Sequence, residues 1–384
     1  MRVASKKIWA LVVGILVVGF LVYRSRGMFR LGDFSGAKLW QALRGANPYY
    51  LILSIVAIYG CYALRALRWE VFQRNLGPSR FWTIYKITLA GFSSVFLLGR
   101  AGEPVRPLLM AREENLPLAD TFGIWALERI FDIASMAVIA AVGLSLYAAR
   151  GASTEKTKSL EAAARTGGTL LFLGVAFAIS VLAYLRLHGT ALLERRLQGW
   201  LETRGWRAKL AGIALGFVRG VQTIRTWSDL ALAALYSGAH WFLVLVIYYW
   251  VSQSFGGTLG TIGLGDSTLA LAFTLVGSAV QVPGVGGGSQ AGTIIAYTAI
   301  FGIGNEQAVA VAIVIWLITF AACSLAGVPI LIQQGFSLGQ LREMAKKEKE
   351  MEKAELRTAV AKDLAKNGAS SETAARNRES SEEN

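Results

Sequence analysis

Two apolar stretches of this 384-residue chain are each broken by glycine and proline, and these breaks constrain the fold more than any other feature. The first break is Gly99-Arg100-Ala101-Gly102-Glu103-Pro104-Val105-Arg106-Pro107, directly after an apolar run that ends at Leu98. The second break begins at Pro283, after the apolar run 268–282. A bilayer tolerates non-helical backbone only where protein buries it or where it lines a cavity. The chain is therefore predicted to fold around these two breaks inside a membrane domain.

The overall composition also predicts a membrane protein. Hydrophobic residues make up 54% of the chain and charged residues 17%, whereas soluble domains carry about 25% charged residues. We expect an all-α polytopic membrane protein with six full spans plus two re-entrant helical hairpins; eight full spans are the alternative. The first hairpin consists of residues 81–98, the break and a short return helix over 104–116. The expected full spans are 8–23, 49–67, 121–148, 169–187, 230–251 and 308–332.

The order of these segments repeats along the chain. In each half a span is followed by a short apolar segment, a Gly/Pro break and a long span, which gives halves at about 49–148 and 230–332. Interrupted segments in corresponding positions are typical of transporters built as inverted repeats. We therefore predict a transmembrane domain over 1–334 and a probable inverted repeat within it.

Basic residues predict how the chain is oriented. The stretch 188–228 is rich in arginine and is expected to form amphipathic helices on the cytoplasmic surface. The loop 252–266 has no basic residue and is expected outside. The charged tail 335–384 is then cytoplasmic and partly disordered. The basic segment 24–47 disagrees with this arrangement, because it would lie outside.

Charged residues follow the first break. Glu128 and Asp132 lie four residues apart and share a helix face, and Arg129 is three residues from Asp132. One interpretation is an internal ion pair that docks this span on its neighbours, and the other is a polar site that faces a cavity. In the second case arginines would offer bidentate donors to a lipid phosphate, while carboxylates balance them or bind a proton or an amine. The donors would be Arg100, Arg106 and Arg129, and the carboxylates Glu103, Glu128 and Asp132. A plain interfacial loop is the alternative for Arg100–Arg106.

The second break carries glycine but no charge. It is either a flexible loop or a tight break whose free amides bind an anion. The residues proposed for that role are Gly284, Gly286, Gly287 and Gln290. A nucleotide loop is excluded, because no Lys-Ser/Thr pair follows the glycines.

We expect no cofactor and no metal site. The two cysteines lie in separate apolar segments, and a single histidine beside an aromatic residue, His240, is more typical of packing. Nucleic acid is not an expected partner, because the chain has no basic, aromatic-interleaved soluble module.

At these motifs the chain resembles the family built on the transmembrane domain of lysylphosphatidylglycerol synthase, also called flippase-like membrane proteins. The resemblance covers about residues 5–335 and rests on the order of four motifs. These are Gly99-Arg100-x-Gly-Glu103, Arg106-Pro107, Glu128-Arg129-x-x-Asp132 and the Pro-Gly break at 283–287. Fused members of that family add a soluble aminoacyl transferase, whereas here only the charged tail follows. Members often have an acidic residue soon after the Pro-Gly break, where this chain has Ser289-Gln290.

The resemblance implies lipid translocation, and we expect a lipid flippase or transporter of the bacterial inner membrane rather than an enzyme. Its cargo would be an anionic or glycosylated phospholipid-type headgroup, so that membrane lipids are the expected partners. One alternative is a membrane-embedded transferase acting on a lipid-linked substrate, with Glu103 or Asp132 as base. Another is an accessory scaffold for a lipid-modifying enzyme. A homo-oligomer or a partner enzyme bound through the tail is left open.

Overall fold

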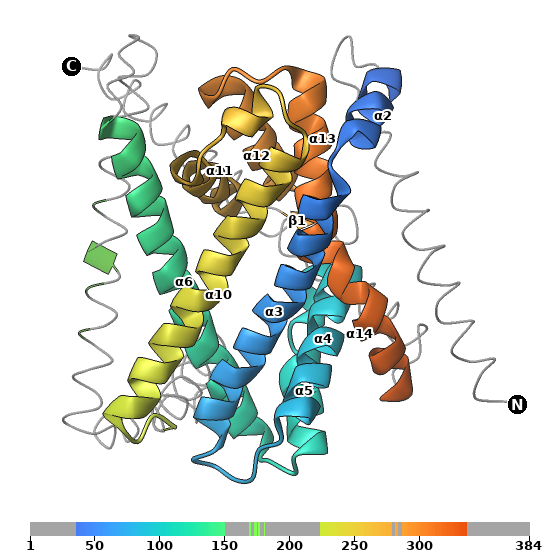
Figure 1. The fold of residues 1–384 in the computed structure, drawn as a ribbon. Helices are drawn as coiled ribbons and strands as arrows, with labels where there is room; N and C mark the ends of the chain where they lie inside the picture. Colours follow the sequence, from blue (N-terminus) through green and yellow to red (C-terminus); the bar gives the residue numbers. More distant parts are fainter. Residues whose placement is uncertain are drawn as a thin grey trace, which may run out of the picture. The chain divides into compact units, whose positions relative to one another are not determined.

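A computed structural model describes residues 36–149, 223–278, 281–282 and 286–335, together with residues 169, 173, 174, 176 and 180. Most of the described residues are helical, and besides turns and loops they include one pair of two-residue strands (Figure 1). In chain order the elements are α2 (Gly36–Gly45), α3 (Pro48–Gln73), α4 (Phe81–Leu98), η1 (Gly99–Gly102), α5 (Val105–Glu113), α6 (Leu118–Ala149), α10 (Trp227–Ser254), η2 (Leu259–Thr261), α11 (Leu264–Gly277), β1 (Gln281–Val282), β2 (Gly286–Gly287), α12 (Gly288–Ile295), η3 (Ala296–Ile300), α13 (Asn305–Trp316), η4 (Leu317–Ala321) and α14 (Ala322–Gln333).

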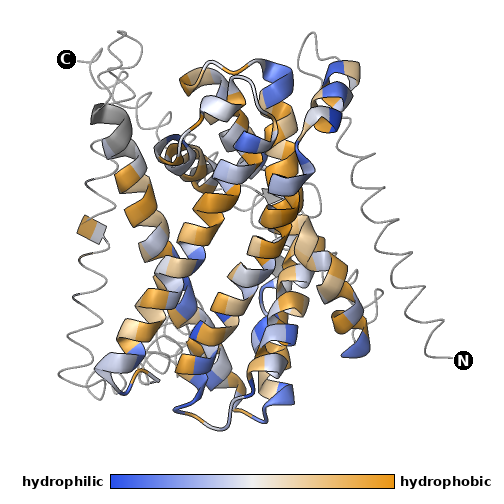
Figure 2. Cartoon of the chain, viewed as in Figure 1, coloured by the Kyte–Doolittle hydropathy of each residue, from blue (hydrophilic) through white to orange (hydrophobic). Residues whose placement is uncertain are grey.

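Within this described part, four helical segments are long and apolar enough to cross a membrane: Pro48–Gln73, Phe81–Leu98, Trp227–Ser254 and Asn305–Gln333. Figure 2 shows hydrophobic residues along most of the length of α3 and α10, with more polar residues towards the ends. A multi-pass membrane protein is therefore supported. The total number of spans stays a prediction, because the expected span 8–23 and most of 169–187 lie outside the described residues.

The first break is a tight reversal of the chain. Helix α4 ends at Leu98, and Gly99 follows with a positive φ of 68°. A Cβ on Gly102 would lie 2.3 Å from the carbonyl oxygen of Ser94, so only glycine allows the chain to return this closely. Gly91 likewise gives way to Arg106, whose Cβ would lie 2.5 Å from a Cβ at position 91. The predicted return helix is confirmed as α5, which packs back against α4.

The second break also lies between two helices that pack against each other, α11 and α12. Gln281 and Val282 pair antiparallel with Gly287 and Gly286, and α12 then packs against α11. A Cβ on Gly277 would lie 2.0 Å from the carbonyl oxygen of Gly288. The tight fit of these helices, like that of the first pair, depends on glycine.

Three helix contacts join segments that are far apart in the sequence. Helix α3 packs along α10, α4 packs against α14, and α6 packs against α11. Glycine allows the last two of these contacts. A Cβ on Gly327 of α14 would lie 2.2 Å from the Leu89 carbonyl oxygen in α4, and a Cβ on Gly143 of α6 would lie 3.2 Å from the Thr268 carbonyl oxygen in α11.

Helix α3 also contacts the irregular middle of the last membrane segment. The π-helical turn η4 separates α13 from α14, and carbonyl groups in and beside it accept hydrogen bonds from two tyrosines. Tyr62 Oη donates to the Thr319 carbonyl over 3.2 Å, and Tyr59 Oη donates to the Ala322 carbonyl over 2.8 Å. These two hydrogen bonds join α3 to the π-helical turn and to the start of α14.

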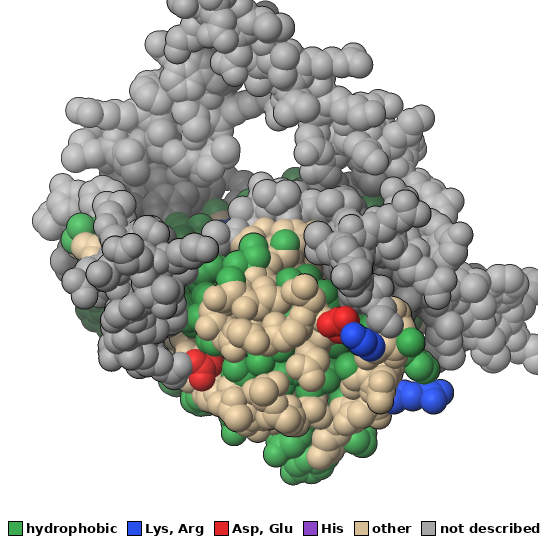
Figure 3. Space-filling view, turned by 90° about the horizontal axis from the view of Figure 1, so that it is seen from above, with side chains coloured by type: hydrophobic (Ala, Val, Ile, Leu, Met, Phe, Trp, Pro, Cys, Tyr) green, Lys and Arg blue, Asp and Glu red, His purple; other side chains and the backbone are tan. Residues whose placement is uncertain are grey.

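Figure 3 views the molecule from above Figure 1 and shows few charged side chains among the described residues on that face. The loop 252–266, which connects α10 to α11, contributes no basic residue. The buried side chains of Arg65, Arg68, Arg106, Glu128 and Asp132 lie instead where α3, α5, α6 and α10 meet.

Candidate functional site: a buried charge cluster

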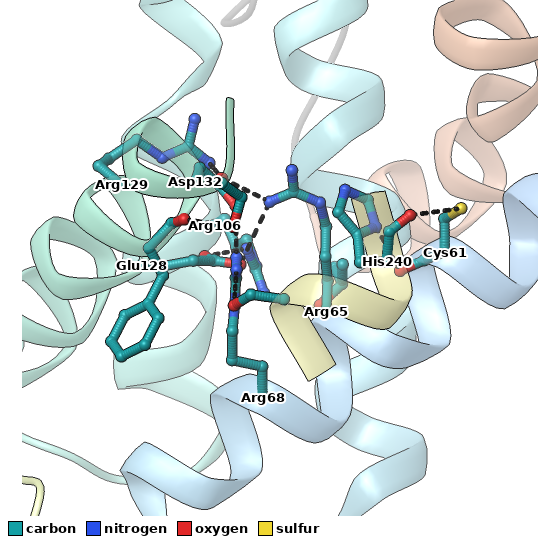
Figure 4. A network of polar contacts seen from close by, with 12 residues as sticks. Cys61, Arg65, Arg68, Arg106, Glu128, Arg129, Asp132 and His240 are labelled. Carbon is teal, nitrogen blue, oxygen red and sulfur yellow. Dashed lines mark hydrogen bonds and ion pairs between the residues drawn. The ribbon is translucent and has the colours of Figure 1, made fainter. Parts of the chain in front are cut away.

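Two arginines of α3 meet two carboxylates of α6 in the interior (Figure 4). Arg65 Nη1 lies 2.8 Å from Asp132 Oδ2 and 3.4 Å from Glu128 Oε1. Arg68 Nη2 donates to Glu128 Oε1 over 2.7 Å and to Asp132 Oδ1 over 2.9 Å. The geometry follows from helical spacing, because positions three and four apart lie on one face. Each arginine therefore bridges both carboxylates.

Helix α5 adds a third arginine to this group. Arg106 Nη1 donates to Glu128 Oε2 over 2.5 Å. Its Cζ lies 4.5 Å from the ring centre of Trp69 and 5.6 Å from that of Phe92, and Arg65 Cζ lies 4.9 Å from Phe92. Aromatic rings attract desolvated guanidinium groups. The rings thus stabilise positive charge that carboxylates alone do not balance.

Arg129 is the outermost member. Its Nη2 lies 3.5 Å from Asp132 Oδ2, and its side chain is 34% exposed, whereas those of Glu128 and Asp132 are 1% and 6% exposed. We call the group Arg65, Arg68, Arg106, Glu128, Arg129 and Asp132 the charge cluster. Through Arg129 the cluster extends from the interior towards the surface of the described residues.

Helix α10 packs beside the cluster and contributes uncharged polar groups. Arg68 Nη1 donates to Ser237 Oγ over 2.8 Å. His240 lies beside Arg65 in Figure 4, and its Nδ1 is 3.3 Å from the carbonyl oxygen of Cys61. His240 is buried, as a packing role predicts, and it is the titratable side chain that α10 brings to this region.

The charge cluster has an excess of positive charge. Four arginines face two carboxylates, which gives a net charge of +2 when all are ionised. Several of their buried nitrogens also have no hydrogen-bond partner within the described part of the chain: Arg68 Nε, Arg106 Nε, Arg106 Nη2 and Arg129 Nε. Buried donors are nearly always satisfied in proteins. These nitrogens can therefore donate to an acceptor outside the described residues.

The predicted site residues have different fates. Arg106, Glu128, Arg129 and Asp132 come together as expected. Glu103 is half-buried in the turn before α5 and makes no ion pair with a described residue. The side chain of Arg100 and the whole of Gly284 lie outside what the structure describes.

The remaining predicted residues form a local structure at the second break. Gly286 and Gly287 make up β2, and the Gly287 amide donates to Gln290 Oε1 over 2.6 Å. Gln290 therefore caps its own helix α12, and no described contact joins it to the charge cluster. Two pairs of hydroxyl groups are also buried in this part of the chain, Thr274 with Thr293 and Ser252 with Tyr297, and the oxygens of each pair are 2.6 Å apart.

Sequence reasoning missed Arg65 and Arg68. Basic and aromatic residues at the end of an expected span such as 49–67 are typical of a membrane interface, but Arg65, Arg68 and Trp69 are all buried. The helix continues to Gln73, so the arginines lie inside it rather than at its end. The available signal was spacing: two arginines three residues apart match two carboxylates four residues apart.

Comparison with known proteins is consistent with this membrane domain. A family model described as the lysylphosphatidylglycerol synthase TM region matches residues 8–327. The chain is also 25% identical over 206 residues to glycosyltransferase AglD of Haloferax volcanii. That similarity covers 49% of this chain and 33% of the relative, so the chain spans about a third of AglD.

Proposed function

The chain belongs to the lysylphosphatidylglycerol synthase transmembrane-region family, and from this membership we propose that it moves a lipid with a phosphate-containing headgroup across the bacterial inner membrane. The headgroup would pass through the membrane domain at the charge cluster while the acyl chains stay in the bilayer. A multi-pass domain that carries buried charge offers the polar route such a headgroup needs, because hydrocarbon alone opposes its passage.

The observation that carries the proposal is the net positive charge of the buried cluster and its unused arginine donors. Arginine recognises phosphate through paired, planar donors. Glu128 and Asp132 each hold two or more arginines, which keeps the guanidinium groups extended into the interior. The carboxylates therefore position the arginines, and the phosphate completes the charge balance.

Different arginines have different parts in this proposal. Arg65 and Arg68 each bind both carboxylates and so form the fixed base of the cluster. Arg106 and Arg129 each contact one carboxylate and keep free nitrogens, so they are assigned to the headgroup. Arg100 and Glu103 lie at the turn before α5 and are proposed as further headgroup contacts near its entrance.

The proposed framework for this movement is an inverted repeat. Three contacts support it, because each joins a helix of residues 49–148 to a helix of residues 230–332: α3 with α10, α4 with α14 and α6 with α11. Such repeats allow one half to rock against the other around a fixed site. The basic-free loop 252–266 supports an outward position for the α10–α11 connection, with the tail after 335 in the cytoplasm.

Translocation of fluorescent phospholipid in proteoliposomes tests the proposal. Arg106→Gln should abolish most of the protein-dependent transport, because it removes both the ion pair with Glu128 and the free donors. Arg112→Gln is the matched control, since Arg112 lies on the same helix, is exposed and donates to the Gln334 carbonyl. Transport at the wild-type rate in well-folded Arg106→Gln protein would exclude the charge cluster from the route.

A transferase acting on a lipid-linked substrate is the second candidate, and the similarity to a protein named glycosyltransferase AglD favours it. Under this alternative the cluster would bind the phosphate of the lipid carrier and Asp132 or Glu103 would act as base. Incubation of the purified protein with a radiolabelled lipid-linked sugar separates the two functions. Chemical turnover supports the transferase, whereas movement of unchanged lipid supports the transporter.

A further inference from the structure

We propose that the charge cluster selects a lipid whose headgroup ends in a phosphate monoester, a dianion, over a lipid phosphodiester, which carries one negative charge. This inference rests on the proposed function and defines the substrate class of the same site. It is carried by the number of charges in the cluster and by the position of the unused donors on Arg106.

The charged groups at the site come from three of the helices packed around it, α3, α5 and α6. Helix α3 provides Arg65 and Arg68, α5 provides Arg106, and α10 provides neutral Ser237 and the titratable His240. Helix α6 provides one arginine and two carboxylates, Arg129, Glu128 and Asp132. With His240 neutral the sum is +2. A phosphate monoester dianion neutralises this charge in full, whereas a phosphodiester neutralises half of it and an amine headgroup adds to the excess.

Arg106 is the buried arginine with two unused donors. Its Nη1 is used by Glu128, but Nε and Nη2 have no partner although the side chain is 5% exposed. These two nitrogens lie along one edge of the planar guanidinium, which is the geometry that binds two phosphate oxygens at once. The contacts with Trp69 and Phe92 are cation–π contacts and do not use these donors. The edge therefore has donors for two oxygens of a phosphate, and a monoester has one more charged oxygen for the other arginines.

The site is not sealed from its surroundings. Arg129 is about one-third exposed and contacts Asp132, which binds Arg65 and Arg68. A phosphate that first meets Arg129 is thus already in contact with the network that holds the inner arginines. This continuity gives the anion a path of positive charge towards Arg106.

Equilibrium binding to the full purified chain in mixed micelles tests the proposal. The two probes are radiolabelled phosphatidic acid, a monoester, and phosphatidylglycerol, a diester, with identical acyl chains. One further charge-assisted hydrogen bond corresponds to an affinity gain of about tenfold or more, so phosphatidic acid should bind about tenfold more tightly at about pH 8. The preference should shrink at about pH 5, because the second phosphate ionisation has a pKa of about 6.

Two variants and two soluble probes make the result specific. Arg106→Gln lowers the net charge of the cluster from +2 to +1, so it should weaken phosphatidic acid binding more than phosphatidylglycerol binding and reduce the monoester preference severalfold. Arg112→Gln should change neither. Any change in the charge of His240 acts on both lipids, so the phosphatidylglycerol measurements correct for it. Inorganic phosphate and glycerol 3-phosphate should compete weakly, because they lack the acyl chains.

Equal affinity for the two lipids at about pH 8, or a full preference in Arg106→Gln, would overturn the proposal. Competition by inorganic phosphate at the concentration of the lipid would assign the site to a soluble anion and overturn its lipid part. Translocation of phosphatidylglycerol without a monoester preference would refute this inference and leave lipid transport standing. A monoester preference without any translocation would support this inference and refute lipid transport.

Discussion

Replacement of Glu128 by glutamine should destabilise the protein through charge rather than shape. Glu128 is 1% exposed, and its carboxylate accepts short hydrogen bonds from Arg68 (2.7 Å) and Arg106 (2.5 Å), with Arg65 at 3.4 Å. Glutamine has nearly the same volume, but it keeps one acceptor oxygen and turns a donor towards the arginines. The net charge of the cluster would rise from +2 to +3 in a buried place.

The expected cost follows from the two short contacts. A hydrogen bond to a charged group contributes about 1.5–3 kcal/mol, and removal of one partner of a buried ion pair costs about 3–5 kcal/mol. We therefore expect Glu128→Gln to lower the free energy of unfolding by about 3–5 kcal/mol. Glu306→Gln is the matched control, because Glu306 pairs over 3.6 Å with Lys38, whose side chain is 69% exposed. An exposed pair of this kind contributes about 0–1 kcal/mol.

Reversible unfolding in mixed micelles with increasing dodecyl sulfate measures these differences. The double variant Glu128→Gln/Arg106→Gln returns the cluster to +2 and should regain about 1–3 kcal/mol over the single Glu128→Gln variant, as expected for directly contacting residues. If Glu128→Gln costs no more than Glu306→Gln, or if the Glu128 and Arg106 effects simply add, the cluster is not an electrostatic unit and the reasoning fails.

Two further predictions concern packing and pH. Gly327→Ala should lower the free energy of unfolding in detergent by about 1–3 kcal/mol, because its Cβ would lie 2.2 Å from the Leu89 carbonyl oxygen and 2.0 Å from Ser93 Oγ. Gly238→Ala, whose Cβ would meet no atom within 4 Å, should be neutral or slightly stabilising. An equal loss of stability in the two variants would contradict this packing. Burial raises the pKa of Glu114 between α5 and α6, so the folded state holds this proton more tightly than the unfolded state and loses stability as pH rises through the folded pKa. Glu114→Gln should therefore gain stability over the wild type as pH rises from about 4 to about 7, and a pH-independent difference would refute this.

The sequence predicted the order of the elements but not every boundary. Apolar runs and Gly/Pro breaks indicate helices and reversals because backbone polar groups must be satisfied inside a membrane, and the return helix α5 followed from that rule. The end of α3 was placed six residues too early, at 67 rather than Gln73. Arginine after an apolar run normally marks the interface, and only carboxylates of another helix allow Arg65 and Arg68 to lie inside.

The candidate site was predictable where its members lie close in sequence. Glu128, Arg129 and Asp132 share one helix, so helical spacing alone places them on adjoining faces. Arg65 and Arg68 could not be assigned in this way, because their partners are 60–67 residues away along the chain. Gln290 has a role that the sequence analysis did not predict, because its Oε1 accepts a hydrogen bond from the Gly287 amide at the start of its own helix; its binding of a ligand stays a prediction.

The distance in sequence between the arginines of α3 and the carboxylates of α6 has a consequence for how the protein is made. Arg68 leaves the ribosome 60 residues before Glu128, which at about 5–20 residues per second is an interval of several seconds. During that interval α3 carries two unpaired positive charges and cannot settle stably in hydrocarbon. Helix α3 must therefore wait in a hydrated environment, at the insertion machinery or the headgroup layer, until α6 arrives. The same ion pairs that shape the site thus make entry of α3 and α6 into the bilayer a joint event, and variants that lack Glu128 or Asp132 should fail first at biogenesis.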